Sequence, residues 1–239
     1  MRYWIGCSGF HYKEWKGLFY PEKLPQSKWF EYYSGIFNTL ELNVTFYRFP
    51  QVKFLENWYS KSNGEFRFSV KAPRLITHYK KFSGTETMLQ DFYGTIRLGL
   101  KEKLGAVLFQ LPPQSTFSIA YLKIIVESMD KSYDNVIEFR HSGWWTNEVY
   151  ELLAENNISF CGISYPKLPN DLIANTEIAY YRFHGIPKLY WSSYDNAFLK
   201  KIADTANHET KVSDCYLYFN NTAGMAAIEN GTWMNQYLL

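Results

Sequence analysis

The sequence has few of the features that mark several large classes of protein. Its three cysteines, Cys7, Cys161 and Cys215, form no Cys-x-x-Cys pair and each lies inside an apolar run, which predicts buried, reduced thiols rather than a disulfide framework. Its longest apolar runs, such as 105–111, are far below the roughly 18 residues that a membrane-spanning helix needs. The 14 glycines and 9 prolines are ordinary amounts that exclude collagen-like and disordered chains.

An excess of charge of one sign is also missing. Lysine and arginine total 25 against 23 aspartate and glutamate residues, a formal charge of +2, which argues against nonspecific binding of polyanions. The chain starts in a strand-like run without the apolar core or cleavage site of a signal peptide, so we expect a cytoplasmic protein. Aromatic residues, by contrast, are abundant, with 8 Trp, 20 Tyr and 18 Phe. Their large apolar faces could stack on a ring-shaped ligand.

Strand-like and helix-like segments alternate along the whole chain. Runs rich in Val, Ile, Phe and Tyr predict eight strands, at 3–9, 39–47, 66–72, 106–111, 135–140, 159–164, 179–184 and 214–220. Helices are predicted at 27–37, 51–62, 85–103, 118–130, 147–156, 195–209 and 222–236, with an irregular sixth connection. Ser27, Ser118 and Thr146 are the candidate N-caps.

This alternation predicts an α/β fold with parallel strands. Eight such units without a linker or a composition break fit one domain over 1–239, a single closed (β/α)8 TIM-type barrel. The rival fold is a doubly wound open sheet, which normally has a glycine-rich first turn. The segment Gly6-Cys7-Ser8-Gly9-Phe10 is too short for a dinucleotide-binding fingerprint, so we expect the barrel.

Polar side chains recur at alternate positions near the ends of the predicted strands. Side chains alternate between the two faces of a strand, so the apolar residues between them face the outer helices and the polar set faces inward. The set comprises Glu41 with Asn43, Ser69 with Lys71, Glu138 with Arg140, Arg182 with His184, Tyr218 with Asn220, and also Gln110 and Ser164. These residues could have a purely structural role, as a network of salt bridges that lines the barrel and satisfies its buried charges. The carboxyl ends of the strands are also where this fold places its active sites, which favours function.

Ten motifs occur in order along the chain. They are Gly6-Cys7-Ser8-Gly9-Phe10, Phe19-Tyr20-Pro21, Glu41-Leu42-Asn43-Val44-Thr45-Phe46-Tyr47, Phe68-Ser69-Val70-Lys71, Thr77-His78, Leu104-Gly105, Phe109-Gln110-Leu111-Pro112-Pro113, Glu138-Phe139-Arg140-His141, Arg182-Phe183-His184-Gly185 and Tyr218-Phe219-Asn220-Asn221. Together they resemble the YecE-like family of uncharacterised proteins, the domain of unknown function seventy-two, essentially end to end. The resemblance implies a TIM-type barrel and lends no reaction.

The chain departs from the pattern of that family in two places. After the sixth predicted strand such sequences often carry an Asp, where this one has Ser164-Tyr165-Pro166. The first motif is followed by His11 and contains Phe10, where the resemblance implies Ser and Trp. These differences leave a carboxylate-dependent role after the sixth strand in doubt and could alter a pocket wall.

The first candidate site is an anion site. Lys71, Arg140 and Arg182 oppose Glu41 and Glu138, a local balance of +1 that an anion would neutralise. Arginine offers a planar fork for oxygen ligands. The loops after the last two strands, including His184 and 220–224, lie where this fold often binds phosphate.

Three alternatives remain open. Glu41 and Glu138 could be the paired carboxylates of a glycosidase, with sugar-stacking walls from Trp4, Trp15, Trp144, Trp145 and Trp191. A divalent metal, as in barrel nucleases and isomerases, could bind His11, His78, His141 or His184 with a carboxylate, and Glu41, Glu138 and His184 are then the expected ligands. The aromatic and basic residues could instead form a noncatalytic surface for a nucleic acid or a partner protein.

The favoured hypothesis is a hydrolase or lyase that acts on a small anionic, phosphorylated substrate containing a ring or sugar. Lys71, Arg140 and Arg182 would hold its charge, His184 would shuttle a proton, and Glu41 or Glu138 would act as base. The remaining predicted substrate contacts are Asn43, Gln110, Trp144, Trp191, Asn220 and Asn221. No cofactor is assigned, a divalent metal stays possible, and the oligomeric state is left open.

Overall fold

Eight parallel strands close into a barrel in the computed structural model, which describes residues 1–239. Each strand pairs with its neighbours in sequence, and β1 pairs with β8 to close the ring. The strands are β1 (Arg2–Cys7), β2 (Thr39–Leu42), β3 (Arg67–Lys71), β4 (Leu104–Gln110), β5 (Asn135–Glu138), β6 (Ile158–Ser164), β7 (Ile178–Phe183) and β8 (Asp214–Phe219). The predicted barrel and all eight strands are confirmed.

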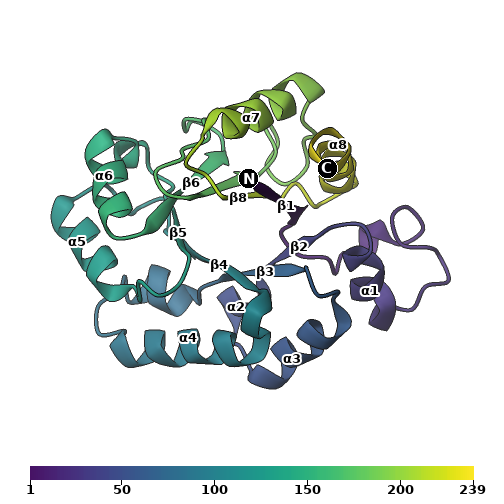
Figure 1. Cartoon of the computed structure of the whole chain (residues 1–239), viewed down its shortest axis with the longest axis horizontal. Coiled ribbons are helices and arrows are strands. Elements are labelled where there is room, and N and C mark those ends of the chain that lie inside the picture. Colours follow the sequence, from purple (N-terminus) through teal and green to yellow (C-terminus); the bar gives the residue numbers. More distant parts are fainter.

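The helices form a ring around the strands (Figure 1). They are α1 (Trp29–Ser34), α2 (Val44–Tyr47), α3 (Val52–Lys61), α4 (Glu86–Leu100), α5 (Ile119–Ser128), α6 (Asn147–Glu155), α7 (Asn196–His208) and α8 (Ala226–Leu238). As predicted, the connection between β6 and β7 contains no helix. No helix is long and apolar enough to cross a membrane.

The second strand is shorter than predicted, whereas two of the predicted caps are confirmed. The strand ends at Leu42 instead of 47, and the chain turns at once into the short helix α2. Thr45 holds this turn, because its hydroxyl donates to the carbonyl oxygens of Leu42 and Lys71 at 2.9 and 2.6 Å. Ser118 and Thr146 cap α5 and α6 as expected.

Ser27 does not cap α1. It lies inside a 3-10 turn over Gln26–Lys28, and the N-cap position of α1 is occupied by Lys28 without a side-chain hydrogen bond. The position of the serine before an aromatic run favoured it as a cap, but the extra turn moves the helix start by one residue.

The apolar core has two parts on the two faces of the strands. The larger part, 53 buried residues, fills the space between strands and helices. The smaller part lies inside the barrel and consists of Trp4, Ala106, Leu108, Val136, Cys161, Ile163, Tyr180, Tyr216 and Tyr218. All three cysteines are buried and free, as predicted. The interior is therefore filled with side chains in its amino-terminal half, and polar groups occupy only the other end.

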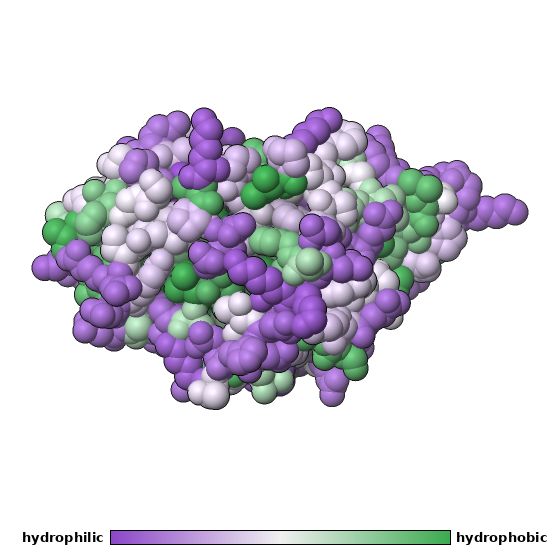
Figure 2. Space-filling view, turned by 90° about the horizontal axis from the view of Figure 1, so that it is seen from above, coloured by the Kyte–Doolittle hydropathy of each residue, from purple (hydrophilic) through white to green (hydrophobic).

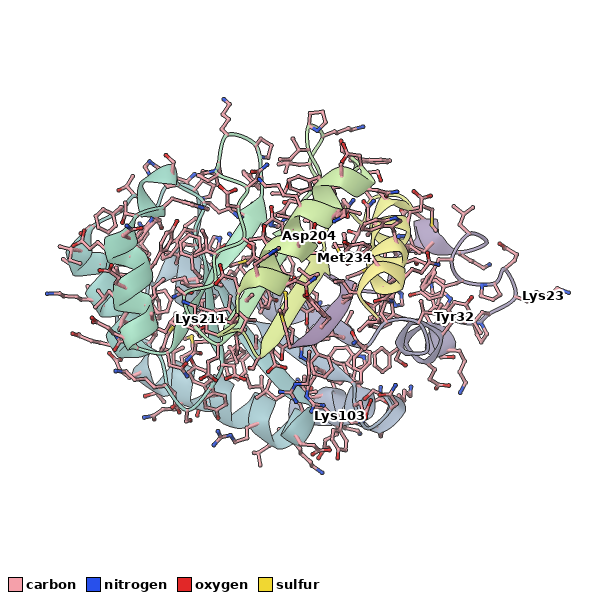
Figure 3. All side chains as sticks on the ribbon, turned by 45° about the horizontal axis from the view of Figure 1, so that its top comes forward. Lys23, Tyr32, Lys103, Asp204, Lys211 and Met234 are labelled. Atoms are coloured by element: carbon pink, nitrogen blue, oxygen red, sulfur yellow. The ribbon has the colours of Figure 1, made fainter.

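The outer surface is mostly polar. On the face shown in Figure 2, apolar patches are small and separated by hydrophilic residues. Figure 3 shows Lys23 at the tip of the long connection between β1 and α1, the part of the chain that extends furthest from the barrel in that view.

Gly6 is required where β1 meets β2. A Cβ atom at this position would lie 2.1 Å from the carbonyl oxygen of Thr39, a backbone atom that the strand pairing holds in place. We expect Gly6→Ala to lower the free energy of unfolding by at least about 3 kcal/mol, the upper range for overpacked cores. Urea denaturation followed by circular dichroism measures this. Gly64→Ala is the control, because nothing lies within 4 Å of its added Cβ; equal midpoints for the two variants would contradict the prediction.

Candidate functional site

Arg182 lies at the centre of the polar end of the barrel and joins two buried carboxylates. Its Nη2 donates to Oε1 of Glu41 at 2.6 Å and its Nη1 donates to Oε2 of Glu138 at 2.5 Å. All three side chains are at most 1% exposed. The alternation of side chains explains this arrangement, because β2, β5 and β7 each turn one of these residues toward the barrel axis. The predicted inward set is confirmed for these three residues.

Each remaining oxygen of the two carboxylates also has a donor. The hydroxyl of Tyr180 donates to Oε2 of Glu41 at 2.7 Å, and Nε of Arg140 donates to Oε1 of Glu138. Burial alone would raise the pKa of Glu138, but the charges of Arg140 and Arg182 outweigh it and hold the pKa well below its usual value. Burial likewise opposes the charge of Arg182, whose pKa the two glutamates raise well above normal. Glu138 and Arg182 therefore stay ionised, and every carboxylate oxygen of the network has a donor, whereas the buried Nε of Arg182 has no partner.

His184 lies behind this network and does not carry a proton near neutrality. Its Nε2 is 3.1 Å from Nη2 of Arg140, and its Nδ1 is 2.8 Å from the side-chain amide of Asn220. Burial, and then the charge of Arg140, lower its pKa to about 3. This low pKa argues against the role of proton shuttle that the reference pKa suggested. His184 instead positions Arg140 by accepting its N–H, which a neutral ring can do.

A cavity of about 260 Å³ opens above the network at the carboxyl ends of the strands. Its lining comprises Tyr12, Asn43, Phe46, Tyr47, Lys71, Gln110, Arg140, Arg182, Tyr190 and Asn220. Six of the predicted substrate contacts therefore meet here. Three basic side chains line the cavity, and no carboxylate is among the lining residues.

The aromatic wall differs from the one expected. Its rings are Tyr12, Phe46, Tyr47 and Tyr190, from the loops after β1, β2 and β7. Sequence reasoning favoured tryptophans and missed Tyr12, Phe46 and Tyr47. Their position in the sequence could have identified Phe46 and Tyr47, because they follow shortly after the strand that carries Glu41.

Among the basic side chains that line this cavity, Lys71 is the one that forms no ion pair with a carboxylate. Its Nζ donates to Oε1 of Gln110 at 2.8 Å and lies 4.1 Å from the centre of the Phe46 ring. The amide of Gln110 is oriented in turn by donation to the Leu111 carbonyl oxygen. Burial, followed by the charge of Arg182, lowers the pKa of Lys71 to about 7. A buried amine whose pKa is lowered toward neutrality thus lines the cavity.

Three predicted substrate contacts do not line the cavity. Trp144 is fully buried, stacked on Phe139 with its Nε1 donating to the carbonyl oxygen of Ser115. Trp191 is 53% exposed on the loop after β7. The third is Asn221.

Asn221 ties that loop to α8. It is buried, and its amide donates to the carbonyl oxygen of Ser192 and to Oδ1 of Asn230. The backbone N–H of Ala223 is also taken, by the carbonyl oxygen of Tyr190. The segment 220–224 is therefore braced against its neighbours.

Ser164 points away from the barrel interior, contrary to the expectation. Its neighbour Ile163 belongs to the interior cluster, and Ser164 itself accepts a hydrogen bond from the Tyr194 hydroxyl at 2.7 Å. The position where related sequences often carry Asp is occupied here by a hydroxyl pair outside the cavity.

The residues present do not fit a divalent metal. No three His, Cys, Asp or Glu side chains come together in a group that could hold an ion. The histidine nitrogens have other partners, since Nδ1 of His141 accepts from the Gly143 amide and Nδ1 of His78 pairs with Thr77. Glu41 and Glu138, the expected carboxylate ligands, are held by arginines. The side chains that were expected to bind a metal therefore interact with other residues.

The glycosidase hypothesis also lacks a free acid. Glu41 and Glu138 are bridged by one guanidinium, and the low pKa of Glu138 is the opposite of what a general acid needs. Of the tryptophans expected as walls, Trp4 lies at the other end of the barrel, where its Nε1 donates to Asp214. Trp15 is fully buried and donates to the Gly224 carbonyl oxygen.

Comparison with known proteins gives one consistent family. The family model described as "Protein of unknown function DUF72" matches residues 4–239. The UPF0759 protein YunF of Bacillus subtilis is 28% identical over 253 aligned positions, covering 92% of this chain and 89% of YunF. The UPF0759 protein YecE of Escherichia coli is 27% identical over 114 positions, covering 46% of this chain and 41% of YecE.

Solved structures agree with the fold. The crystal structure of a DUF72 family protein from Thermotoga maritima has a TM-score of 0.89 and 31% identity, covering 100% of this chain and 99% of that one. A DUF72 family protein from Enterococcus faecalis, at 18% identity, has a TM-score of 0.84 over 99% of this chain and 95% of that one. The second likeness concerns the fold alone.

Removing the bridging guanidinium should be costly. We expect Arg182→Met to destabilise the protein by about 3–5 kcal/mol, because Glu41 loses its ion-pair partner and Glu138 keeps only Arg140. Adding Glu41→Gln to the same chain should recover part of this loss. Urea unfolding of the single and double variants measures both effects, with the exposed Arg48→Met as control. A single variant no less stable than the control would show that the network contributes nothing.

We expect His184 to remain neutral at acidic pH in the folded protein. We expect the ring resonances of His184 to be unchanged from about pH 8 to about pH 5, whereas the urea-unfolded chain titrates near about 6.5. Because only the unfolded state takes up this proton, stability should fall as the pH drops from about 6.5 toward the folded pKa of about 3. Nuclear magnetic resonance, assigned with His184→Asn, follows the titration. A transition of the folded resonance near pH 6.5 would refute it.

Proposed function

The chain belongs to the DUF72 family of proteins of unknown function, and on that premise we propose that it is a lyase or hydrolase acting on a small anionic substrate that contains a ring or sugar. The sequence favours a phosphate ester as its anionic group. The proposal rests on the cavity at the carboxyl ends of the strands, whose lining contains Lys71, Arg140 and aromatic rings and no Asp or Glu. This is the end of the barrel where enzymes of this fold place their chemistry.

The charges favour an anion. With Lys71 protonated, three cations and two carboxylates leave one positive charge in the cluster, and Arg182 is already matched by the carboxylates on both Nη atoms. The excess charge then belongs to the wall that Lys71 and Arg140 share. An anion bound there would meet these cations in surroundings of low polarity, which strengthens the attraction.

The walls favour a small molecule with a flat face. Tyr12, Phe46, Tyr47 and Tyr190 offer ring surfaces, while Asn43, Gln110 and Asn220 add amide groups that can orient hydroxyls. The volume of about 260 Å³ is close to the lower limit of the roughly 300–1,000 Å³ usual for ligand pockets. A substrate the size of a sugar phosphate or a substituted aromatic ring fits this space better than a polymer.

Lys71 takes the acid–base role that the sequence assigned to a glutamate. Both glutamates are committed to arginines, whereas the pKa of Lys71 is brought to about 7 by burial and Arg182. General acid–base catalysis works best with a group whose pKa lies near the operating pH. Its Nζ, held by Gln110, lines the cavity and can give or take a proton there.

A ring-bearing dianion tests the site directly. We expect 4-nitrophenyl phosphate to bind in titration calorimetry at about pH 6, and Lys71→Met to weaken it about tenfold or more, because a hydrogen bond to a charged group contributes about 1.5–3 kcal/mol. Lys80→Met, an exposed lysine after the same strand, should bind like the wild type. Absence of binding to the wild type, or equal affinity in Lys71→Met, would contradict the site.

Turnover separates an enzyme from a binding protein with the same groups. Proton magnetic resonance of the protein with a pool of sugar phosphates and oxo acids should show signals lost with the wild type and retained with Lys71→Met. Signals that decline equally with both proteins would remove Lys71 from the reaction.

A further inference from the structure

We propose that Lys71 is a nucleophile that forms an imine with the carbonyl group of an anionic aldehyde or ketone bound in the cavity. The inference rests on the proposed function and specifies its chemistry. The protein has two buried lysines, Lys71 and Lys103, and their amino groups have different contacts.

Lys103 shows what a buried lysine with a purely structural role looks like here. It directly precedes β4 at the amino-terminal end of the barrel and is labelled in Figure 3. Its Nζ donates to the carbonyl oxygens of Tyr59 and Ser62 and to the Ser62 hydroxyl, at 2.8–2.9 Å. All three ammonium protons thus have acceptors, and the charged form is fully satisfied.

Lys71 has only one such acceptor. Apart from Oε1 of Gln110, its Nζ meets the face of Phe46 and the cavity. No carboxylate oxygen lies within 4 Å of it, although two glutamates are part of the neighbouring network. The ring face of Phe46 gives the ammonium a cation–π contact, but only one of its three protons has an oxygen acceptor, which is costly for a buried charge. A neutral amine needs fewer partners and presents a lone pair. The geometry therefore favours the nucleophilic form.

Burial is the largest cause of the lowered pKa of Lys71. Among the neighbouring charges, Arg182 and Arg140 lower this pKa, and Glu138 and Glu41 raise it. Desolvation combined with a nearby cation is a known way to activate a lysine amine toward carbonyl compounds. Gln110 fixes the amine without protonating it, because an amide oxygen can only accept.

The step balances without an added oxidant or cofactor. The lone pair of Nζ forms a C–N bond to the carbonyl carbon, and the oxygen takes up a proton to give a carbinolamine. Loss of that oxygen as water, with one further proton, leaves a protonated imine. The electron pair of an adjacent C–H or C–C bond then moves into the imine to give an enamine, and the proton, carbonyl fragment or carbon dioxide that this bond held leaves. Uptake of a proton on carbon and hydrolysis by water release the product and free Nζ, which is lyase chemistry of the kind proposed above.

Asn43 supplies a second, independent observation. Its side chain lines the cavity, and its buried Oδ1 has no hydrogen-bond partner. Buried polar atoms normally have a partner. A small rotation of this amide toward the cavity would let a substrate hydroxyl, or the hydroxyl of the carbinolamine, donate to its oxygen. The anionic group would then lie toward Arg140, and an apolar or ring portion against Phe46 and Tyr47.

Reductive trapping tests the imine. The wild-type protein is incubated with phenylpyruvate, a carboxylate ketone, or with glyceraldehyde 3-phosphate, a phosphate aldehyde, and sodium cyanoborohydride at about pH 7. We expect one adduct, heavier than the protein by the probe less one oxygen atom, on the peptide that contains Lys71. Labelling should be on the order of a hundredfold faster than at Lys80, since an ordinary lysine is almost fully protonated at this pH. The faster probe shows whether the site prefers a carboxylate or a phosphate.

Two variants and one inert analogue make the result decisive. Lys71→Arg cannot form an imine, so it should lose the adduct, and its binding of 4-nitrophenyl phosphate is measured separately. Lys80→Met should keep both. Phenyllactate, which lacks the carbonyl, should give no adduct. Absence of a Lys71 adduct with both probes, or an adduct that persists in Lys71→Arg, would overturn the imine. Retained anion binding in that case would leave the proposed function standing, whereas loss of binding in the wild type would remove both.

Discussion

The bridge that Arg182 makes between Glu41 and Glu138 is the constraint on which the carboxyl end of the barrel depends. It joins β2, β5 and β7 across the barrel interior, with every charged atom nearly inaccessible to water. None of the three groups could remain charged there alone, because burial of an unmatched ion costs several kcal/mol. The bridge therefore decides which groups are available for chemistry. Both carboxylates form ion pairs with Arg182, and Glu138 also pairs with Nε of Arg140. Lys71 forms no ion pair.

The charged layer rests on an aromatic layer that closes the barrel from the other end. Trp4, Tyr180, Tyr216 and Tyr218 pack inside the strands, and Trp4 is anchored to Asp214 at the amino-terminal rim. Tyr180 belongs to both layers, because its ring packs below while its hydroxyl donates to Glu41. Water is thus excluded from one side of the network, which strengthens each ion pair within it. The other side of the network faces the cavity, so a bound ligand or a proton can change the net charge of the network only from that side.

The sequence predicts the fold better than the site, for identifiable physical reasons. Alternation of polar and apolar residues has a period of two, which places Glu41, Glu138 and Arg182 inside a barrel without knowledge of their partners. The same rule fails for Ser164, since an error of one residue in a strand reverses its faces. Which ion pairs form depends on distances between residues as far apart as 141 positions, as for Arg182 and Glu41. No local pattern contains that information, so the special position of Lys71 emerges only from the folded chain.

The count of charges explains why one site could serve both anion binding and amine chemistry. With Lys71 neutral, Arg140 and Arg182 balance Glu41 and Glu138, and the cluster has no net charge. A protonated imine adds one positive charge, and a substrate with one carboxylate adds one negative charge, so the cluster is again neutral. A phosphate dianion would leave one negative charge in excess, near two buried carboxylates. In a water-excluded site, the path that keeps the net charge at zero avoids the largest electrostatic cost. On this ground an oxo acid matches the neutral-amine state of the site more closely than a phosphate ester does.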